Sequence, residues 1–169
     1  MNRLLSCITL AVGLLLSSCG YHLGGLKPER MEKLETFCVR MFGNYTTQPG
    51  VAMQVTNAVA DAMQRDGTYR MAPASSADFV VTGEVASISR NSLRTDPEDS
   101  YLSTEIELTI RVRYKVIDRH TGETLWQATA HGSGSYFNQV GNVQTAIESA
   151  LSYAARQAAD DIVLTLTTL

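Results

Sequence analysis

The chain has 169 residues, a mass of 18.4 kDa and a formal net charge of −3, and 44% of its residues are hydrophobic. This composition fits one ordinary globular domain and is too apolar for a disordered chain. The lack of a basic excess argues against a nucleic-acid-binding protein. Three cysteines are too few for a disulfide framework.

Residues 1–18 have the features of a lipoprotein signal peptide. Arg3 supplies a positive start, and residues 4–16 form an apolar run that is shorter than the roughly 20 residues needed to cross a bilayer. The run ends in Leu16-Ser17-Ser18-Cys19, which resembles the bacterial lipobox. The thiol of Cys19 would accept a diacylglycerol group, and its freed amine a further acyl chain, which together hold a protein firmly at a membrane. The alternative is a chance cysteine in a leader that is cut elsewhere.

The residue after Cys19 bears on the location of the protein. In well-studied enteric bacteria an Asp at this position retains a lipoprotein in the inner membrane, so Gly20 favours the outer membrane. Residues 19–33 contain three glycines, Pro28 and mixed charges, and we expect them to form a lipidated tether. Residues 34–169 would then form a single domain, anchored by its lipid to the periplasmic face of the outer membrane.

The first half of this domain predicts a strand, a helix and a second strand. Residues 34–43 alternate in the manner of a strand, and residues 50–66 carry apolar side chains three or four positions apart, as in a helix that Gly67 ends. A second strand is expected over residues 77–90, followed by a polar loop over residues 90–100.

The clearest pattern lies in residues 104–117, where apolar and polar residues alternate over twelve consecutive positions, as in a strand with one buried and one wet face. A turn follows over residues 118–123, and residues 124–131 return as another strand that Gly132-Ser133-Gly134-Ser135 would end. The last element is a helix over residues 143–165, with Asn142 as its expected N-cap.

This order of elements predicts an α+β fold with two layers. We expect a mostly antiparallel four-stranded sheet in the order β-α-β-β-β-α, with both helices on one face. The other face would remain open. Its charged residues are either simply solvated or part of a docking surface.

We find no pattern of residues that indicates catalysis. His22, His120 and His131 lie in the expected tether, a turn and a strand end, and no pair has zinc-site spacing. The chain has no Gly-rich phosphate loop and no Gly-x-Ser-x-Gly motif. We therefore expect neither an enzyme nor a metal site, and no cofactor apart from the covalent lipid on Cys19.

Several motifs, in their joint order, resemble the LptE family of lipopolysaccharide-assembly lipoproteins. The mature chain would open with Cys19-Gly20-Tyr21-His22-Leu23-Gly24-Gly25, as family members commonly do. The resemblance continues through the following four segments: Phe42-Gly43-Asn44-Tyr45-Thr46 with Pro49-Gly50; Arg65-Asp66-Gly67-Thr68-Tyr69-Arg70; Ala77-Asp78 before Val80-Val81-Thr82-Gly83; and Asp118-Arg119 with Thr121-Gly122-Glu123 and Leu125-Trp126.

The resemblance implies a role as a partner protein. LptE proteins sit inside the β-barrel LptD in the outer membrane, help it assemble, plug its lumen and bind lipopolysaccharide. Basic residues bind the lipopolysaccharide phosphates in the family, some of them near the loop between the second and third long strands. By position, Arg90 and Arg94 are the nearest equivalents here, with Arg111, Arg113 and Lys115 on the open face as a second choice.

Two other hypotheses stay open at this point. The chain could be a different envelope lipoprotein, such as a secretion-channel or stress-related module with a similar α+β domain, which predicts self-assembled rings or a soluble partner. It could also be an envelope hydrolase, which would need a polar pocket with a strongly perturbed titratable group. The sequence offers no candidate for such a group.

Overall fold

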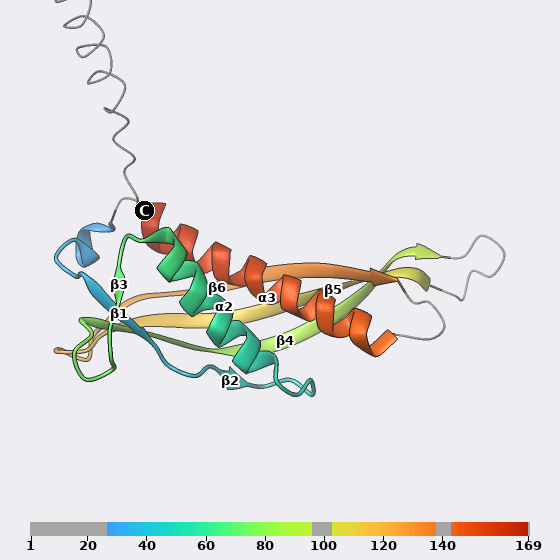
Figure 1. Ribbon diagram of the computed structural model, residues 1–169, viewed down its shortest axis with the longest axis horizontal. Coiled ribbons are helices and arrows are strands. Elements are labelled where there is room, and N and C mark those ends of the chain that lie inside the picture. Colours follow the sequence, from blue (N-terminus) through green and yellow to red (C-terminus); the bar gives the residue numbers. More distant parts are fainter. Residues whose placement is uncertain (1–26, 96–102, 138–142, 169) are drawn as a thin grey trace, which may run out of the picture.

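The computed structural model describes residues 27–95, 103–137 and 143–168 of the chain. The elements follow one another as shown in Figure 1: η1 (Glu29–Met31), β1 (Thr36–Val39), β2 (Gly43–Asn44), α2 (Val51–Asp66), β3 (Arg70–Met71), β4 (Phe79–Thr95), β5 (Ser103–Asp118), β6 (Thr124–Phe137) and α3 (Val143–Thr168). The predicted Asn142 cap, Cys19 and most of the expected tether lie outside the described residues.

The α+β class is confirmed, but the sheet is mixed rather than mostly antiparallel and has six strands rather than four. Its order is β3-β1-β4-β5-β6, and β2 also pairs with β4. The three long strands β4, β5 and β6 are antiparallel, whereas β1 and β2 run parallel to β4. The crossover through α2 returns the chain in the same direction, which makes β1 and β4 parallel. The additional strands β2 and β3 have two residues each, too few to show any periodicity.

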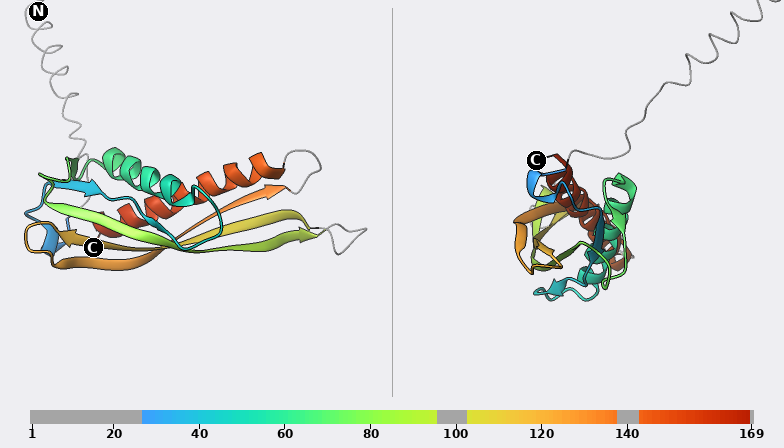
Figure 2. Two further views of the ribbon diagram at one scale, coloured as in Figure 1. Left: turned by 90° about the horizontal axis from the view of Figure 1, so that it is seen from below. Right: turned by 90° about the vertical axis from the view of Figure 1, so that its left-hand side faces the viewer.

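Both helices pack on one face of the sheet, as predicted (Figure 2). The inner face of α2 is formed by Val51, Val55, Val59, Ala62 and Met63, all buried. The helix ends as the sequence indicates, because Gly67 adopts a left-handed conformation with φ of 77° and its N–H donates to the Met63 carbonyl. Glycine carries no Cβ, so this backbone conformation costs it little.

The alternation of β5 is confirmed residue by residue. Its even-numbered side chains lie against the helices, and those buried are Leu108, Ile110, Val112, Tyr114 and Val116. Its odd-numbered side chains lie on the opposite face, which the described helices leave open (Figure 2). A period of two in the sequence therefore placed the buried and wet faces correctly.

Strand β6 is longer than predicted, because the Gly-Ser-Gly-Ser segment continues the strand instead of ending it. A Cβ on Gly132 would collide with the Ala154 carbonyl oxygen and lie 2.6 Å from the Ala158 nitrogen. A Cβ on Gly134 would collide with the Ala150 carbonyl oxygen. These glycines let α3 approach the strand closely, which is a known use of glycine within a strand.

Strand β4 is also longer than predicted. It extends to Thr95, so residues 90–95 are not the loop that their polarity indicated. The register of β4 with β5 continues from Phe79↔Asp118 to Thr95↔Ser103, with irregularities after Val85 and near Arg94. A polar sequence can form a strand here because the end of the hairpin lies beyond α2 and has little core to face (Figure 1).

The start of the described chain packs onto the domain. Met31 in η1 is 1% exposed and belongs to the core. Lys27 donates from Nζ to the Leu34 carbonyl at 2.7 Å. The last residues of the expected tether are therefore held against the fold.

Candidate functional site on the open face of the sheet

The sheet face opposite the helices carries the basic residues of β5. Arg111, Arg113 and Lys115 all lie on this face and are exposed. They occupy alternate positions of one strand, so their side chains emerge in a row. The sequence therefore identified this cluster correctly as three residues on one face.

Each basic side chain has neighbours on the two adjacent strands. Lys115 lies between Thr82 of β4 and Gln127 of β6 in the ladder, and Arg113 lies between Glu84 and Thr129. A shallow hollow of about 490 Å³ opens among these side chains. The hollow is polar and offers hydrogen-bond donors and acceptors from three strands.

Arg113 forms an ion pair with Glu84 through its guanidinium. The Glu84 side chain is 27% exposed and the Arg113 side chain 60% exposed, so water screens the pair in part. This pair orients Arg113 and offsets part of its charge. Lys115 has no acidic residue directly opposite it in the ladder.

Arg111 occupies the next row, between Ser87 and His131. His131 is exposed and lies on the same face. Farther along β5 the charge changes sign, because Glu107 and Glu105 follow on the open face. The open face is thus basic near the β5–β6 turn and acidic towards the other end of β5.

Arg90 and Arg94 are separate from this cluster. Arg90 pairs with Leu108, so it lies on the helix side of the sheet, and its side chain is exposed. The backbone of Arg94 pairs with Glu105, and its side chain lies outside the described residues. The structure therefore does not bring the five predicted basic residues together on one surface.

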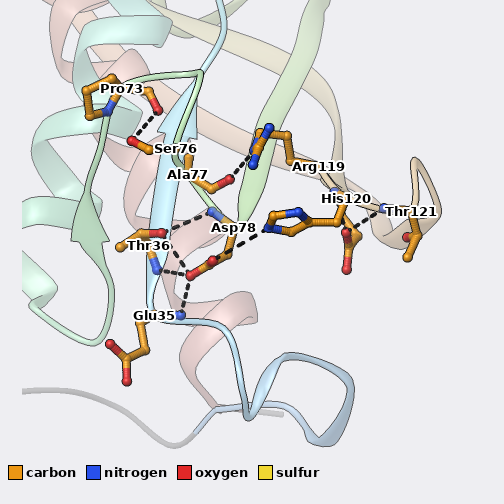
Figure 3. A network of polar contacts seen from close by, with 10 residues as sticks. Glu35, Thr36, Pro73, Ser76, Ala77, Asp78, Arg119, His120 and Thr121 are labelled. Atoms are coloured by element: carbon orange, nitrogen blue, oxygen red, sulfur yellow. Dashed lines mark hydrogen bonds and ion pairs between the residues drawn. The ribbon is translucent and has the colours of Figure 1, made fainter.

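A second group of polar contacts joins the strands at one end of the sheet (Figure 3). The Asp78 carboxylate accepts hydrogen bonds from the backbone N–H of Glu35 at 3.0 Å and of Thr36 at 2.9 Å, and from the Thr36 hydroxyl at 2.8 Å. His120 Nε2 lies 4.0 Å from the same carboxylate. These contacts lower the pKa of Asp78, with the Glu35 N–H as the largest cause.

The β5–β6 turn contributes to this group from the other side. The Arg119 side chain donates from Nε to the Ala77 carbonyl at 2.6 Å. The backbone N–H of Arg119 donates to the Asp78 carbonyl at 2.9 Å. Within the turn, Asp118 Oδ1 accepts from the N–H groups of His120 and Thr121, and the Thr121 N–H is the main cause of its lowered pKa. These contacts, the Asp78 cluster, fasten the start of β1 and the β5–β6 turn to β4.

The turn before α2 is held in a similar way. Asn44 Oδ1 accepts from the N–H and the hydroxyl of Thr46 at 2.9 and 2.8 Å, and Asn44 Nδ2 donates to the Gln48 carbonyl. Gly50 then takes a left-handed conformation with φ of 76°. The glycosylation-like sequence Asn44-Tyr45-Thr46 is thus a turn-forming motif.

Among residues 27–95, 103–137 and 143–168, no three His, Cys, Asp or Glu side chains gather as a metal site would require. In the same part of the chain, no helix has the length and apolar character to traverse a bilayer.

Comparison with known families supplies the decisive observation. The family model described as "LptE: Lipopolysaccharide-assembly" matches residues 34–166. The chain belongs to the LptE family. No curated protein matches it in sequence.

Solved structures share the LptE-type fold at low sequence identity. The protein of the PelC dodecamer from Paraburkholderia phytofirmans has a TM-score of 0.53 and 20% identity, over 86% of this chain and 96% of that one. A hypothetical protein from Chlamydia trachomatis has a TM-score of 0.56 and 10% identity, over 78% and 95%. A protein from Xanthomonas campestris has a TM-score of 0.54 and 12% identity, over 87% and 88%. At these identities the similarity shows the fold alone.

The structure gives the motifs that resemble LptE a physical role. Ala77-Asp78 and the turn from Asp118 to Thr121 meet in the Asp78 cluster, although they are far apart in the sequence. Asn44 and Thr46 close the turn before α2. These three LptE-like motifs therefore form hydrogen bonds that stabilise the fold. The sequence did not show that two of them are in contact, because only the antiparallel return of β5 brings them together.

Proposed function

We propose that this chain is an outer-membrane lipoprotein that binds and plugs an LptD-type β-barrel, assists its assembly and helps deliver lipopolysaccharide to the cell surface. The match of the LptE family over residues 34–166 carries this proposal. The fold supports it, since one face of the sheet is open and polar and is available to a partner. The proposed role needs neither catalysis nor a cofactor, and nucleic acid is not among the partners.

The anchor would be a covalent lipid on Cys19. In this proposal residues 1–18 are the signal peptide, residues 19–33 form the tether, and residues 34–169 form the domain on the periplasmic side of the outer membrane. Since Met31 is buried in the core, the free part of the tether would end before η1. The domain would consequently be held close to the membrane surface.

For lipopolysaccharide, we favour the row formed by Arg111, Arg113 and Lys115 over Arg90 and Arg94, because the three side chains are exposed on one open face whereas Arg90 lies on the helix side of the sheet. Arginine can bind a phosphate through two parallel hydrogen bonds, and lysine binds it as a point charge. Of the three residues, Arg113 is already paired with Glu84. We therefore assign the main phosphate contacts to Arg111 and Lys115, and a minor role to Arg90 and Arg94.

Depletion of the protein in the source bacterium tests the proposed function. We expect surface lipopolysaccharide to fall and the LptD-type barrel to misassemble, and we expect the barrel to co-purify with the full-length chain. Re-expression from a plasmid should restore both. Normal surface lipopolysaccharide together with a correctly assembled barrel after depletion would contradict the proposal.

The alternative is an envelope module that assembles with copies of itself and has no role in lipopolysaccharide transport. It is favoured by the fold similarity to the protein of the PelC dodecamer. This alternative predicts a ring of defined size for the purified lipidated chain, with no barrel in the complex. Mass photometry of the detergent-solubilised protein distinguishes the two.

A further inference from the structure

An apolar pocket, the Trp126 pocket, lies where η1 meets the start of β6 and the end of α3. Its volume is about 260 Å³, and its apolar lining residues are Pro28, Met31, Leu125, Trp126 and Leu166. Met31 and Leu166 belong to the core, whereas Leu125 and Trp126 are only half-buried. Contact of such side chains with water is unfavourable, so an apolar group that fills the pocket would stabilise the fold.

The charged residues of the Trp126 pocket do not point to a charged ligand. They are Glu29 and Arg30, which are adjacent on η1, opposite in charge and both exposed. The side chains around the pocket therefore carry no net charge. An aliphatic group fits this lining best.

The chain enters the domain at the rim of this pocket. Lys27 precedes Pro28, the first lining residue, and η1 lies beside the C-terminal end of α3 (Figure 1). The nearest apolar residue on the other side of Lys27 is Leu26. An acyl chain or a side chain of a partner could compete for the pocket. Leu26 is the favoured occupant because its covalent connection to Pro28 gives it a high effective concentration there.

The backbone next to the pocket favours the same occupant. Pro28 is extended, with φ of −55° and ψ of 145°, and a residue that precedes proline is restricted to extended conformations. In an extended chain, side chains two positions apart share a side. Lys27 directs its ammonium to the Leu34 carbonyl at 2.7 Å and over the Tyr69 ring, 5.3 Å from its centroid. Leu26 would therefore lie on the side of Pro28, towards the pocket.

We propose that the side chain of Leu26 fills the Trp126 pocket and fastens the tether to the domain. The tether would then leave the domain at Gly25, beside the C-terminal end of α3. This end of the molecule would consequently face the membrane anchor. The docking does not require a lipid on Cys19, so it holds or fails independently of the proposed function.

Fluorescence of Trp126 tests this proposal, because it is the single tryptophan of the sequence. The full-length chain is expressed in the source bacterium, and the protein is purified in dodecyl maltoside as the cell processes it. Quenching by acrylamide and thermal unfolding are then measured for wild type and for Leu26→Ser. The matched control is Leu23→Ser, the same substitution farther from Pro28 in the same segment.

We expect the quenching constant of Leu26→Ser to rise about twofold and its unfolding temperature to fall by about 3 to 6 °C, because a leucine side chain is lost from an apolar site beside the indole. Leu23→Ser should match wild type in both measurements. Unchanged quenching in Leu26→Ser, or an equal rise in both variants, would overturn the proposal.

A second measurement applies if Leu26→Ser does not fold. Position 26 then carries p-benzoylphenylalanine, living cells are irradiated, and the adduct is mapped by mass spectrometry. We expect an adduct within the chain, to the segment of Leu125 and Trp126 or to Leu166. An adduct to a lipid or to another protein, or no adduct, would overturn the proposal equally.

Discussion

Asp78 connects three parts of the chain that are distant in sequence. Its carboxylate accepts a hydrogen bond from the Thr36 hydroxyl at the start of β1. Its backbone N–H donates to Thr36, and its backbone carbonyl accepts from the backbone N–H of Arg119. A carboxylate that accepts several hydrogen bonds is stabilised in its charged form, which lowers its pKa. The stability of the fold should therefore depend on the ionisation of this one side chain.

We expect Asp78→Asn to lower the free energy of unfolding at pH 7 by about 1 to 2 kcal/mol, because the hydrogen bonds lose their charged acceptor. The pKa of Asp78 is lowered in the folded state, so its contribution is complete above the ordinary value of 3.8 and is lost as the pH falls towards the folded-state value. Denaturant unfolding at pH 7 and pH 3 measures this. The difference between wild type and variant should shrink at pH 3, whereas Asp61→Asn, an exposed change on α2, should have little effect at either pH.

The open-face cations permit a similar test of binding. We expect the double variant Arg111→Ala, Lys115→Ala to weaken the affinity for purified lipopolysaccharide about thirtyfold, since each of the two charge-assisted contacts to phosphate contributes on the order of 1 kcal/mol. The matched control is Arg65→Ala, Arg156→Ala, which removes the same number of charges from a groove between α2 and α3. Equal losses in the two double variants would indicate a general effect of net charge and contradict the assignment.

The packing of α3 against β6 depends on two residues without side chains. Gly132 and Gly134 face Ala154, Ala158 and Ala150, so backbone meets backbone at this contact. Alanines on the helix and glycines on the strand together permit the close approach. The approach also brings Asp161 and Gln157 to the outer edge of β6.

We expect Gly132→Ala to destabilise the fold by about 2 to 4 kcal/mol, because the new Cβ collides with helix backbone that cannot move aside cheaply. The control is Ser133→Ala, which leaves the N–H bond to Gln157 in place. Thermal unfolding of both variants gives the comparison. An unfolding temperature of Gly132→Ala within a degree or so of wild type would show that α3 is free to move away from the strand.

The whole molecule has two layers, with its helices on one side and a polar sheet surface on the other (Figure 2). Residues 34–166 of this domain match the LptE family. Lys27 and Met31 pack against the domain. A lipid on Cys19 would therefore be joined to this packed segment by residues 20–26.

We expect Cys19→Ala to abolish lipidation and to release the domain from the outer membrane. Mass spectrometry of the wild-type protein should show a chain that begins at Cys19 and carries acyl groups, and fractionation should place the variant in the soluble periplasm or retain its uncleaved precursor. Cys38→Ala is the control, because Cys38 lies within β1. An unmodified wild-type chain would contradict the proposed anchor.

Periodicity along the chain was sufficient to predict the helix over residues 50–66, its end at Gly67, and the two faces of β5. These features depend on local spacing and on the conformational freedom of glycine, both of which are visible in the sequence. The row of Arg111, Arg113 and Lys115 follows from the same alternation. The family resemblance, built on motifs in order, was likewise available from the sequence and is confirmed.

Contacts between distant segments could not be predicted in this way. The parallel pairing of β1 with β4, the separation of Arg90 from the open-face cations, and the meeting of Asp78 with the β5–β6 turn all depend on how strands are placed beside one another. The sequence predicted that Gly132 to Ser135 end the strand, because the sequence alone does not distinguish a glycine in a turn from a glycine packed against a helix. Only the position of α3 against β6 distinguishes them, since the need for space beside a glycine is set by a neighbour more than fifteen residues away.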